Sequence, residues 1–145
     1  MKRITVQLLT LAAQEADIVG LTGFTLRRGG TVPDFTGWTA AGIEERMQLI
    51  RAAAGDRYDH LELNALVQRV IVTDQRRHAA EELTGRWPQL RAEEILQCPY
   101  VLIGTVDQIV EELQAHRARW GISCYVIFEP YVDAFAPIVT RLAGR

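Results

Sequence analysis

Two short segments carry groups that could bind an anion. Gly104 and Thr105 precede a helical pattern, and the free backbone N–H groups and dipole of a helix N-terminus can bind a phosphate or carboxylate without a charged side chain. Thr105 and Gln108 also match a capping box, which explains the same residues equally well. Arg27 and Arg28 adjoin two glycines and could pair with an anion through charge-assisted hydrogen bonds, although solvated arginines in an exposed loop are the alternative.

Polar and apolar side chains alternate along one predicted strand, residues 61–72. Glu62, Asn64 and Gln68 fall on the face opposite the apolar residues Leu61, Leu63, Ala65 and Val67. These three polar residues could line a ligand cavity, but a polar layer whose members hydrogen-bond one another fits the pattern equally well. Glu129, after the last predicted strand, could orient a ligand, with an exposed carboxylate as the alternative. None of these residues is assigned a catalytic role.

The elements that would position these groups alternate along the chain. Apolar residues recur at helical spacing in residues 4–14, 39–54, 74–84, 92–96, 105–120 and 131–142, and strand-like runs occupy residues 16–21, 61–72, 101–103 and 122–128. We expect Thr39, Thr105 and either Thr73 or Asp74 to cap helices, and the run 122–128 to be fully buried. Residues 22–38 form a long connection rich in Gly, Thr and Pro, of the kind that often carries function. Strands alternating with helices predict a parallel sheet with right-handed crossovers.

The predicted sheet is incomplete for its class. Three strands, with residues 101–103 as a candidate fourth, would leave both edges of the sheet unpaired. Polar residues on one face of a central strand fit a barrel, whose strands turn that face toward the lumen, better than a sheet covered by helices on both sides. A complete barrel of this type takes roughly 250 residues. We therefore expect an α/β fold, a partial TIM-type barrel formed by the single domain 1–145.

Composition excludes several classes of function. The 16 Lys and Arg residues are scattered and nearly balanced by 18 Asp and Glu residues, so no basic patch for nucleic acid is expected. No apolar stretch suits a membrane span, and early acidic residues do not fit a secretory signal, so we expect a cytoplasmic protein. Cys98 and Cys124 are isolated from each other and from histidine, which predicts buried thiols and no metal site.

Three ordered motifs resemble one known family. Residues 8–21, LLTLAAQEADIVGL, resemble the LAA-x-x-AD stretch of the luciferase-like oxidoreductases, which use a flavin or a deazaflavin. Residues 99–113, PYVLIGTVDQIVEEL, resemble the late P-x-x-L-x-G-T-x-x-Q-[IV] signature of that family. Residues 120–127, WGISCYVI, are similar to its final G-[IV]-S-x-x-V strand. The resemblance covers nearly the whole chain, in the order of the C-terminal half of the family's barrel.

The resemblance carries functional expectations with it. It implies an oxidoreductase that transfers hydride between a deazaflavin coenzyme or FMN and an organic substrate, with Gly104 and Thr105 near the phosphate-bearing tail of the cofactor or the substrate. The family's N-terminal strands, which contribute much of the cofactor cleft, are not matched. Partner strands are therefore expected from a second copy, as a homo-oligomer, or from a separate N-terminal half chain. The alternative is a non-catalytic half-barrel or truncated fragment that persists as an oligomer.

Overall fold

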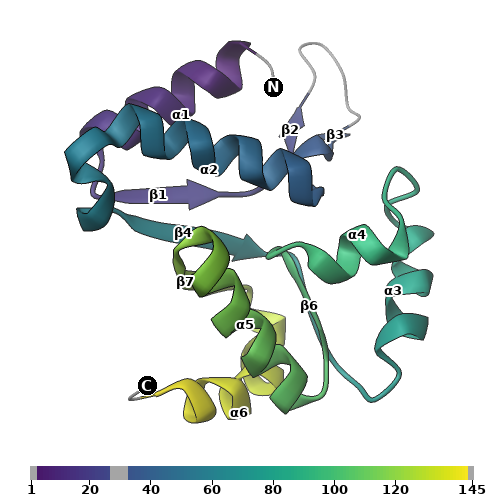
Figure 1. Ribbon diagram of the computed structural model, residues 1–145. Coiled ribbons are helices and arrows are strands. Elements are labelled where there is room, and N and C mark those ends of the chain that lie inside the picture. The colour runs from purple at the N-terminus through teal and green to yellow at the C-terminus, as the bar shows by residue number, and fades with distance from the viewer. Residues whose placement is uncertain (1–2, 27–32, 144–145) are drawn as a thin grey trace.

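Helices and strands alternate through the computed structural model, which describes residues 3–26 and 33–143 (Figure 1). The first part contains α1 (Arg3–Glu15), β1 (Ile18–Leu21), β2 (Thr25–Leu26), β3 (Pro33–Asp34), the 3-10 helix η1 (Thr36–Trp38), α2 (Ala40–Ala54) and the 3-10 helix η2 (Gly55–His60). The rest contains β4 (Glu62–Val67), β5 (Arg69–Val72), α3 (Arg76–Thr84), α4 (Ala92–Gln97), β6 (Val101–Gly104), α5 (Val106–Trp120), β7 (Ile122–Ile127), the 3-10 helix η3 (Glu129–Tyr131) and α6 (Val132–Leu142).

The central feature is a parallel sheet in the order β1-β4-β7. Its strands follow their order along the chain, although β6, which lies between β4 and β7 in sequence, is not part of this sheet. Helices α1 and α2 lie side by side over one face of this sheet (Figure 1). Residues that alternate toward these helices, among them Val19, Leu21, Leu63 and Ala65, are buried. An α/β architecture with parallel strands and flanking helices, consistent with a partial TIM-type fold, is thus confirmed.

The predicted strand 61–72 divides at Gln68, which is a correction. Residues up to Val67 form β4 in the central sheet, whereas β5 pairs in parallel with β6 in a separate ladder. The Gln68 N–H donates a hydrogen bond to the Tyr100 carbonyl oxygen at 2.7 Å, at the point where the strand changes partner. Beyond Val67 the backbone needs new partners, and β6 supplies them. The candidate fourth strand therefore exists but lies outside the three-stranded sheet.

The last strand, β7, is not fully buried, and the prediction that it would be was wrong. Ile122 is fully buried, but Val126 is 43% exposed. The register with β4 shifts between Leu63 and Asn64, so Leu63 pairs with Ile122 and Asn64 pairs with Cys124. Helices cover the face of this strand that carries Ile122, and the face that carries Val126 is open.

Two apolar clusters form the core. The larger lies between the central sheet and helices α1 to α4, and it contains Trp38, Trp87 and Tyr100. The smaller joins β5 and β6 to α5 and α6 through residues that include Leu102, Ile109 and Ile138. Helix α5 thus belongs to the second cluster at its start and to the first at its end, where Trp120 is buried.

Most helix ends follow the predicted chemistry. Thr39 caps α2 by accepting a hydrogen bond from the Gly42 N–H, and Gly121 ends α5 in the left-handed conformation, with φ 75°. The predicted cap of α3 by Thr73 or Asp74 was wrong, because the helix begins later, after Gln75. The Thr73 hydroxyl oxygen instead accepts a hydrogen bond from the Gln75 N–H in the preceding turn.

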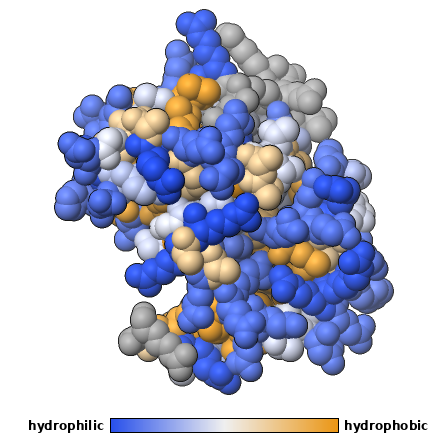
Figure 2. Space-filling model, viewed as in Figure 1, coloured by the Kyte–Doolittle hydropathy of each residue, from blue (hydrophilic) through white to orange (hydrophobic). Residues whose placement is uncertain are grey.

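The surface visible in Figure 2 is mainly hydrophilic, with small separate hydrophobic patches. Within residues 3–26 and 33–143, no helix combines the length and the apolar character that crossing a membrane requires.

Candidate functional site

The open face of the central sheet carries a small polar cluster. Glu62 and Asn64 lie on β4, and the register shift places Cys124 of β7 directly beside Asn64. The Asn64 amide nitrogen Nδ2 donates a hydrogen bond to the Cys124 sulfur at 3.4 Å. Partial burial raises the pKa of the Cys124 thiol, and the nearby Glu62 charge raises it further. Exposed apolar side chains of Ile18 and Val126 flank this cluster on the same face.

Gln68 faces a different environment from Glu62 and Asn64. It lies where β4 ends, beside a pocket of about 150 Å³ that is otherwise lined by Phe24, Pro33, Phe35, Trp38 and Trp87. The Trp38 ring packs edge-on against Trp87 with their centroids 4.8 Å apart, and its Nε1–H donates to the Thr22 carbonyl oxygen at 3.2 Å. In (β/α) barrels the C-terminal ends of the strands form the active face. The pocket lies at the C-terminal end of β4.

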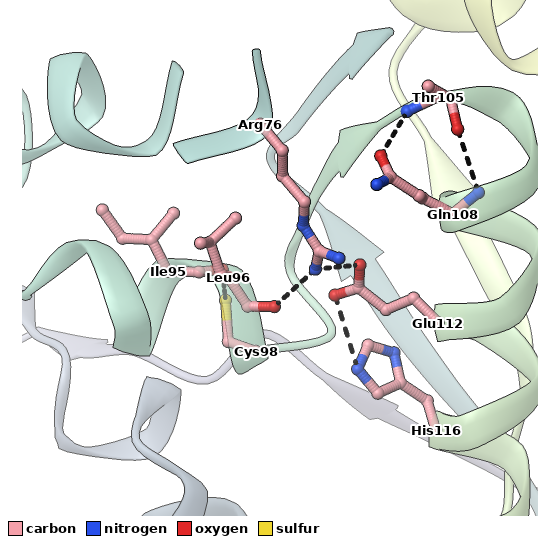
Figure 3. Close-up of polar contacts among 8 residues, drawn as sticks. All are labelled: Arg76, Ile95, Leu96, Cys98, Thr105, Gln108, Glu112 and His116. Atoms are coloured by element: carbon pink, nitrogen blue, oxygen red, sulfur yellow. Dashed lines mark hydrogen bonds and ion pairs between the residues drawn. The ribbon is translucent and has the colours of Figure 1, made fainter. Parts of the chain in front are cut away.

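Gly104 and Thr105 lie at the far end of β6, and they form the predicted capping box. The Thr105 N–H donates to Gln108 Oε1 at 2.9 Å, and the Gln108 N–H donates to Thr105 Oγ1 at 3.3 Å (Figure 3). Gly104 has φ 144°, and a Cβ on this residue would lie 2.8 Å from Gln108 Oε1. The turn therefore requires glycine. The capping explanation is confirmed, and anion binding at these residues stays a prediction.

Removing the Thr105 hydroxyl should cost stability whether or not an anion is present. We expect Thr105→Ala to lower the free energy of unfolding by about 1 kcal/mol, because the Gln108 N–H loses its acceptor. Thr105→Ser keeps the hydroxyl oxygen, so its free energy of unfolding should fall much less. Urea denaturation of both variants measures the difference, and equal losses would contradict the role of the hydroxyl as a cap.

The remaining predicted residues do not join these groups. Arg27 and Arg28 lie outside the described residues, so their contact with an anion stays a prediction. Glu129 is exposed at the start of η3, beyond the end of β7. Of the predicted residues, Glu62 and Asn64 share the open face of β4, while Gln68, Glu129 and the Gly104-Thr105 turn each lie elsewhere.

A buried ionic cluster between three helices was missed by sequence reasoning. Arg76 at the start of α3 donates through Nη2 to Glu112 Oε2 on α5 at 2.7 Å and to the Leu96 carbonyl oxygen of α4 at 3.1 Å (Figure 3). His116, one turn after Glu112, places its Nε2 3.8 Å from Glu112 Oε1 and stacks on the Trp120 ring. The spacing of Glu112 and His116, four residues apart on a strongly predicted helix, was the available signal.

Burial is the largest cause of the pKa shifts of Glu112 and His116 in this cluster. The side chains of Glu112 and His116 are only 8% and 7% exposed. Burial raises the pKa of Glu112 to about 7, although the positive charge of Arg76 partly opposes the rise. Burial also lowers the pKa of His116 to about 4, although the nearby Gln97 backbone partly opposes the fall. At neutral pH the imidazole is therefore neutral and the Glu112 carboxyl group is partly protonated.

In the ranges that the structure describes, no group of three or more His, Cys, Asp or Glu side chains is placed to hold a metal ion. Cys98 is buried, and its burial raises the pKa of its thiol to about 12. Cys124 is only partly buried, so the prediction of two buried thiols is correct for Cys98 alone.

Comparison with solved structures relates this geometry to a known barrel. The crystal structure of LadA, a long-chain alkane monooxygenase, matches 92% of this chain and 38% of its own with a TM-score of 0.53. LadA has the bacterial luciferase-like fold, which is a TIM barrel. The chain thus has part of a luciferase-like barrel fold. At 18% sequence identity the similarity shows the fold alone. The chain spans well under half the length of LadA, no family model matches it, and no curated protein matches its sequence.

The aromatic pocket and the open sheet face differ in how they could accommodate a three-ring coenzyme. Ligand pockets usually enclose roughly 300–1,000 Å³, so the aromatic pocket of about 150 Å³ is too small to hold a three-ring coenzyme. The open sheet face carries the Asn64 amide in the middle of β4 and the apolar Leu66 and Val126 near the C-terminal ends of β4 and β7, while the Glu62 carboxylate lies at the N-terminal end of β4. Such a mixture of apolar surface and a few polar groups is typical of cofactor sites.

Proposed function

We propose that this chain supplies part of the wall of a luciferase-like oxidoreductase barrel that holds a flavin or deazaflavin against an organic substrate. The observation that carries the proposal is the asymmetry of the sheet β1-β4-β7. One face is sealed by helices, and the other bears Asn64, Glu62 and Cys124 among exposed apolar side chains. A barrel wall is expected to have such an asymmetry, because its outer surface packs on helices and its inner surface faces the lumen.

Polar and apolar groups on the open face have different roles in this proposal. The bound coenzyme would supply hydride transfer to or from the substrate. The Asn64 amide, in the middle of β4, would orient a polar edge of the ligands through a hydrogen bond, while Leu66 and Val126, near the C-terminal ends of β4 and β7, would exclude water from the ring. Gly104 and Thr105 are proposed to lie near a phosphate-bearing tail, in line with the resemblance described above.

The proposal includes partner strands. Within the described residues, β1 and β7 each pair with β4 on one side only. Unpaired strand edges readily pair with further strands. We propose that these edges of β1 and β7 continue the barrel, with strands that come from a second copy or from an N-terminal half, whether on the same polypeptide or on another.

Thiol labelling tests this arrangement, because the two cysteines differ in burial. Cys124 lies on the open face, and Cys98 is enclosed in the core, where it provides an internal control. We expect maleimide to label Cys124 and spare Cys98, and saturating FMN or a 5-deazaflavin to slow the labelling of Cys124. An unchanged labelling rate with both coenzymes, measured by mass spectrometry, would argue against a coenzyme on this face.

A matched pair of substitutions localises the binding. Asn64→Leu removes the amide from the open face, and we expect it to weaken coenzyme binding about tenfold, which corresponds to the loss of roughly one hydrogen bond. Gln48→Leu makes a similar change on the exposed surface of α2 and should leave the affinity unchanged. Fluorescence titration of the coenzyme measures both. Equal affinities for the two variants would place the coenzyme elsewhere.

A further inference from the structure

A second cleft lies between α5 and the pair α3 and α4, built around the Arg76, Glu112 and His116 cluster. Its volume of about 460 Å³ is within the range of small-molecule sites. Polar side chains dominate its lining, together with the apolar surfaces of Leu96 and Trp120. Figure 3 shows Arg76 reaching from α3 toward Glu112 and His116 on α5, so that the three polar groups converge between the helices.

Three buried polar atoms in this cleft lack a hydrogen-bond partner among the described residues. They are Nε of Arg76, Oε1 of Glu112 and Nδ1 of His116. Buried polar atoms are nearly always paired, because an unpaired one costs free energy of desolvation. Three such atoms lie on neighbouring side chains, two of which are more than nine-tenths buried, so a water molecule or a polar ligand is needed to satisfy them.

The hydrogen bonds of Arg76 indicate the chemistry of that ligand. Its contacts with Glu112 and with the Leu96 carbonyl oxygen both use Nη2, so the guanidinium group holds Glu112 through one nitrogen only. A guanidinium group presents five N–H donors in a planar fork that matches a carboxylate. We propose that this cleft binds a small organic carboxylate, with the Arg76 guanidinium as its charge partner and the Glu112 carboxyl group as a hydrogen-bond donor. The apolar body of the ligand packs on Leu96 and Trp120.

This ligand binds together with a proton. An ionised Glu112 would repel a carboxylate, whereas the protonated carboxyl group donates a hydrogen bond to it. Burial places the pKa of Glu112 near 7, so protonation is accessible at neutral pH. Several other titratable or charged groups face the Glu112 side chain or share its cleft. They are Arg76 of α3, Glu111, His116 and Arg119 of α5, Cys98 after α4, and Tyr125 of β7.

Benzoate is a suitable probe, because it joins a carboxylate to a compact apolar ring. Calorimetric titration should show binding at pH 6, and the dissociation constant should be about tenfold larger at pH 8, since one proton with a pKa near 7 is taken up. Benzamide, which has the same shape and no charge, should bind much more weakly. Absence of benzoate binding at pH 6 would overturn the proposal.

Single substitutions test which side chains of the cleft bind benzoate. Glu112→Gln keeps a hydrogen-bond donor that stays neutral at every pH, so its affinity for benzoate should be the same at pH 6 and pH 8. Arg76→Gln should abolish binding, whereas Arg77→Gln, a change at the exposed neighbouring residue, should not. Undiminished binding to Arg76→Gln, or a persistent tenfold pH effect in Glu112→Gln, would overturn the proposal. The cleft does not involve the open sheet face, so these results are independent of coenzyme binding there.

Discussion

The free energy of unfolding of a Glu112→Gln variant is expected to rise by up to about 3 kcal/mol between pH 4 and pH 6.5. In this variant His116 remains as the buried titratable group. Its pKa is about 4 in the folded protein and near 6.5 in the unfolded chain. Between these values the unfolded chain binds a proton that the native state does not, so stability increases with pH. A pKa difference of about 2.5 sets the size of the effect.

The complementary variant, His116→Gln, is expected to show the opposite trend. Glu112 then remains, with a folded pKa near 7 and an unfolded pKa near 4.5. Between these values the native state holds a proton that the unfolded chain has lost, so stability decreases as pH rises, again by up to about 3 kcal/mol. In the unmodified protein the two trends largely cancel.

Urea denaturation across pH 4 to 8 measures both trends as differences from the unmodified protein. The exposed pair of His78 and Glu82 on α3 provides a matched control, because it has the same four-residue spacing and lies in solvent. His78→Gln and Glu82→Gln should leave the pH dependence nearly unchanged. If Glu112→Gln and His116→Gln shifted the curve in the same direction, the assignment of a neutral imidazole beside a protonated carboxyl group would be wrong.

Trp38→Ala is expected to lower the free energy of unfolding by about 3–5 kcal/mol, the range for truncating a buried large aromatic side chain. Trp38 is 1% exposed and packs against Phe35, Trp87 and Tyr100. Its truncation would leave a cavity where the larger core cluster meets the ends of β1 and β4. Trp38→Phe refills part of that space and should cost clearly less. A loss below about 1 kcal/mol for Trp38→Ala in urea denaturation would contradict this packing.

Local chemistry explains which parts of the fold could be predicted from the sequence. The Thr105 and Gln108 capping box depends only on residues close in the chain, and it forms as expected. The alternation in residues 61–67 likewise indicates which side chains face the helices. The division at Gln68 could not be predicted, because both halves of the run 61–72 have strand character and the change of partner depends on β6, which lies more than 30 residues later.

In the candidate sites, too, features that depend on local sequence could be predicted and features that depend on tertiary packing could not. Glu62 and Asn64 could be placed on one face from the period of the strand, but Cys124 joins them only through the register shift between β4 and β7. Arg76 and Glu112 belong to helices that the sequence predicts separately, and nothing in either helix shows that they meet. Tertiary packing brings such pairs together, so their altered pKa values could not be predicted from the sequence.

We propose that this chain forms part of a luciferase-like barrel wall that holds a flavin or deazaflavin. Visible absorption of the purified protein, with and without added FMN or a 5-deazaflavin, tests it most directly when combined with the mass of the particle in solution. We predict that coenzyme stays bound to a particle larger than the 16.3 kDa chain. A colourless monomer that binds neither coenzyme would contradict the claim.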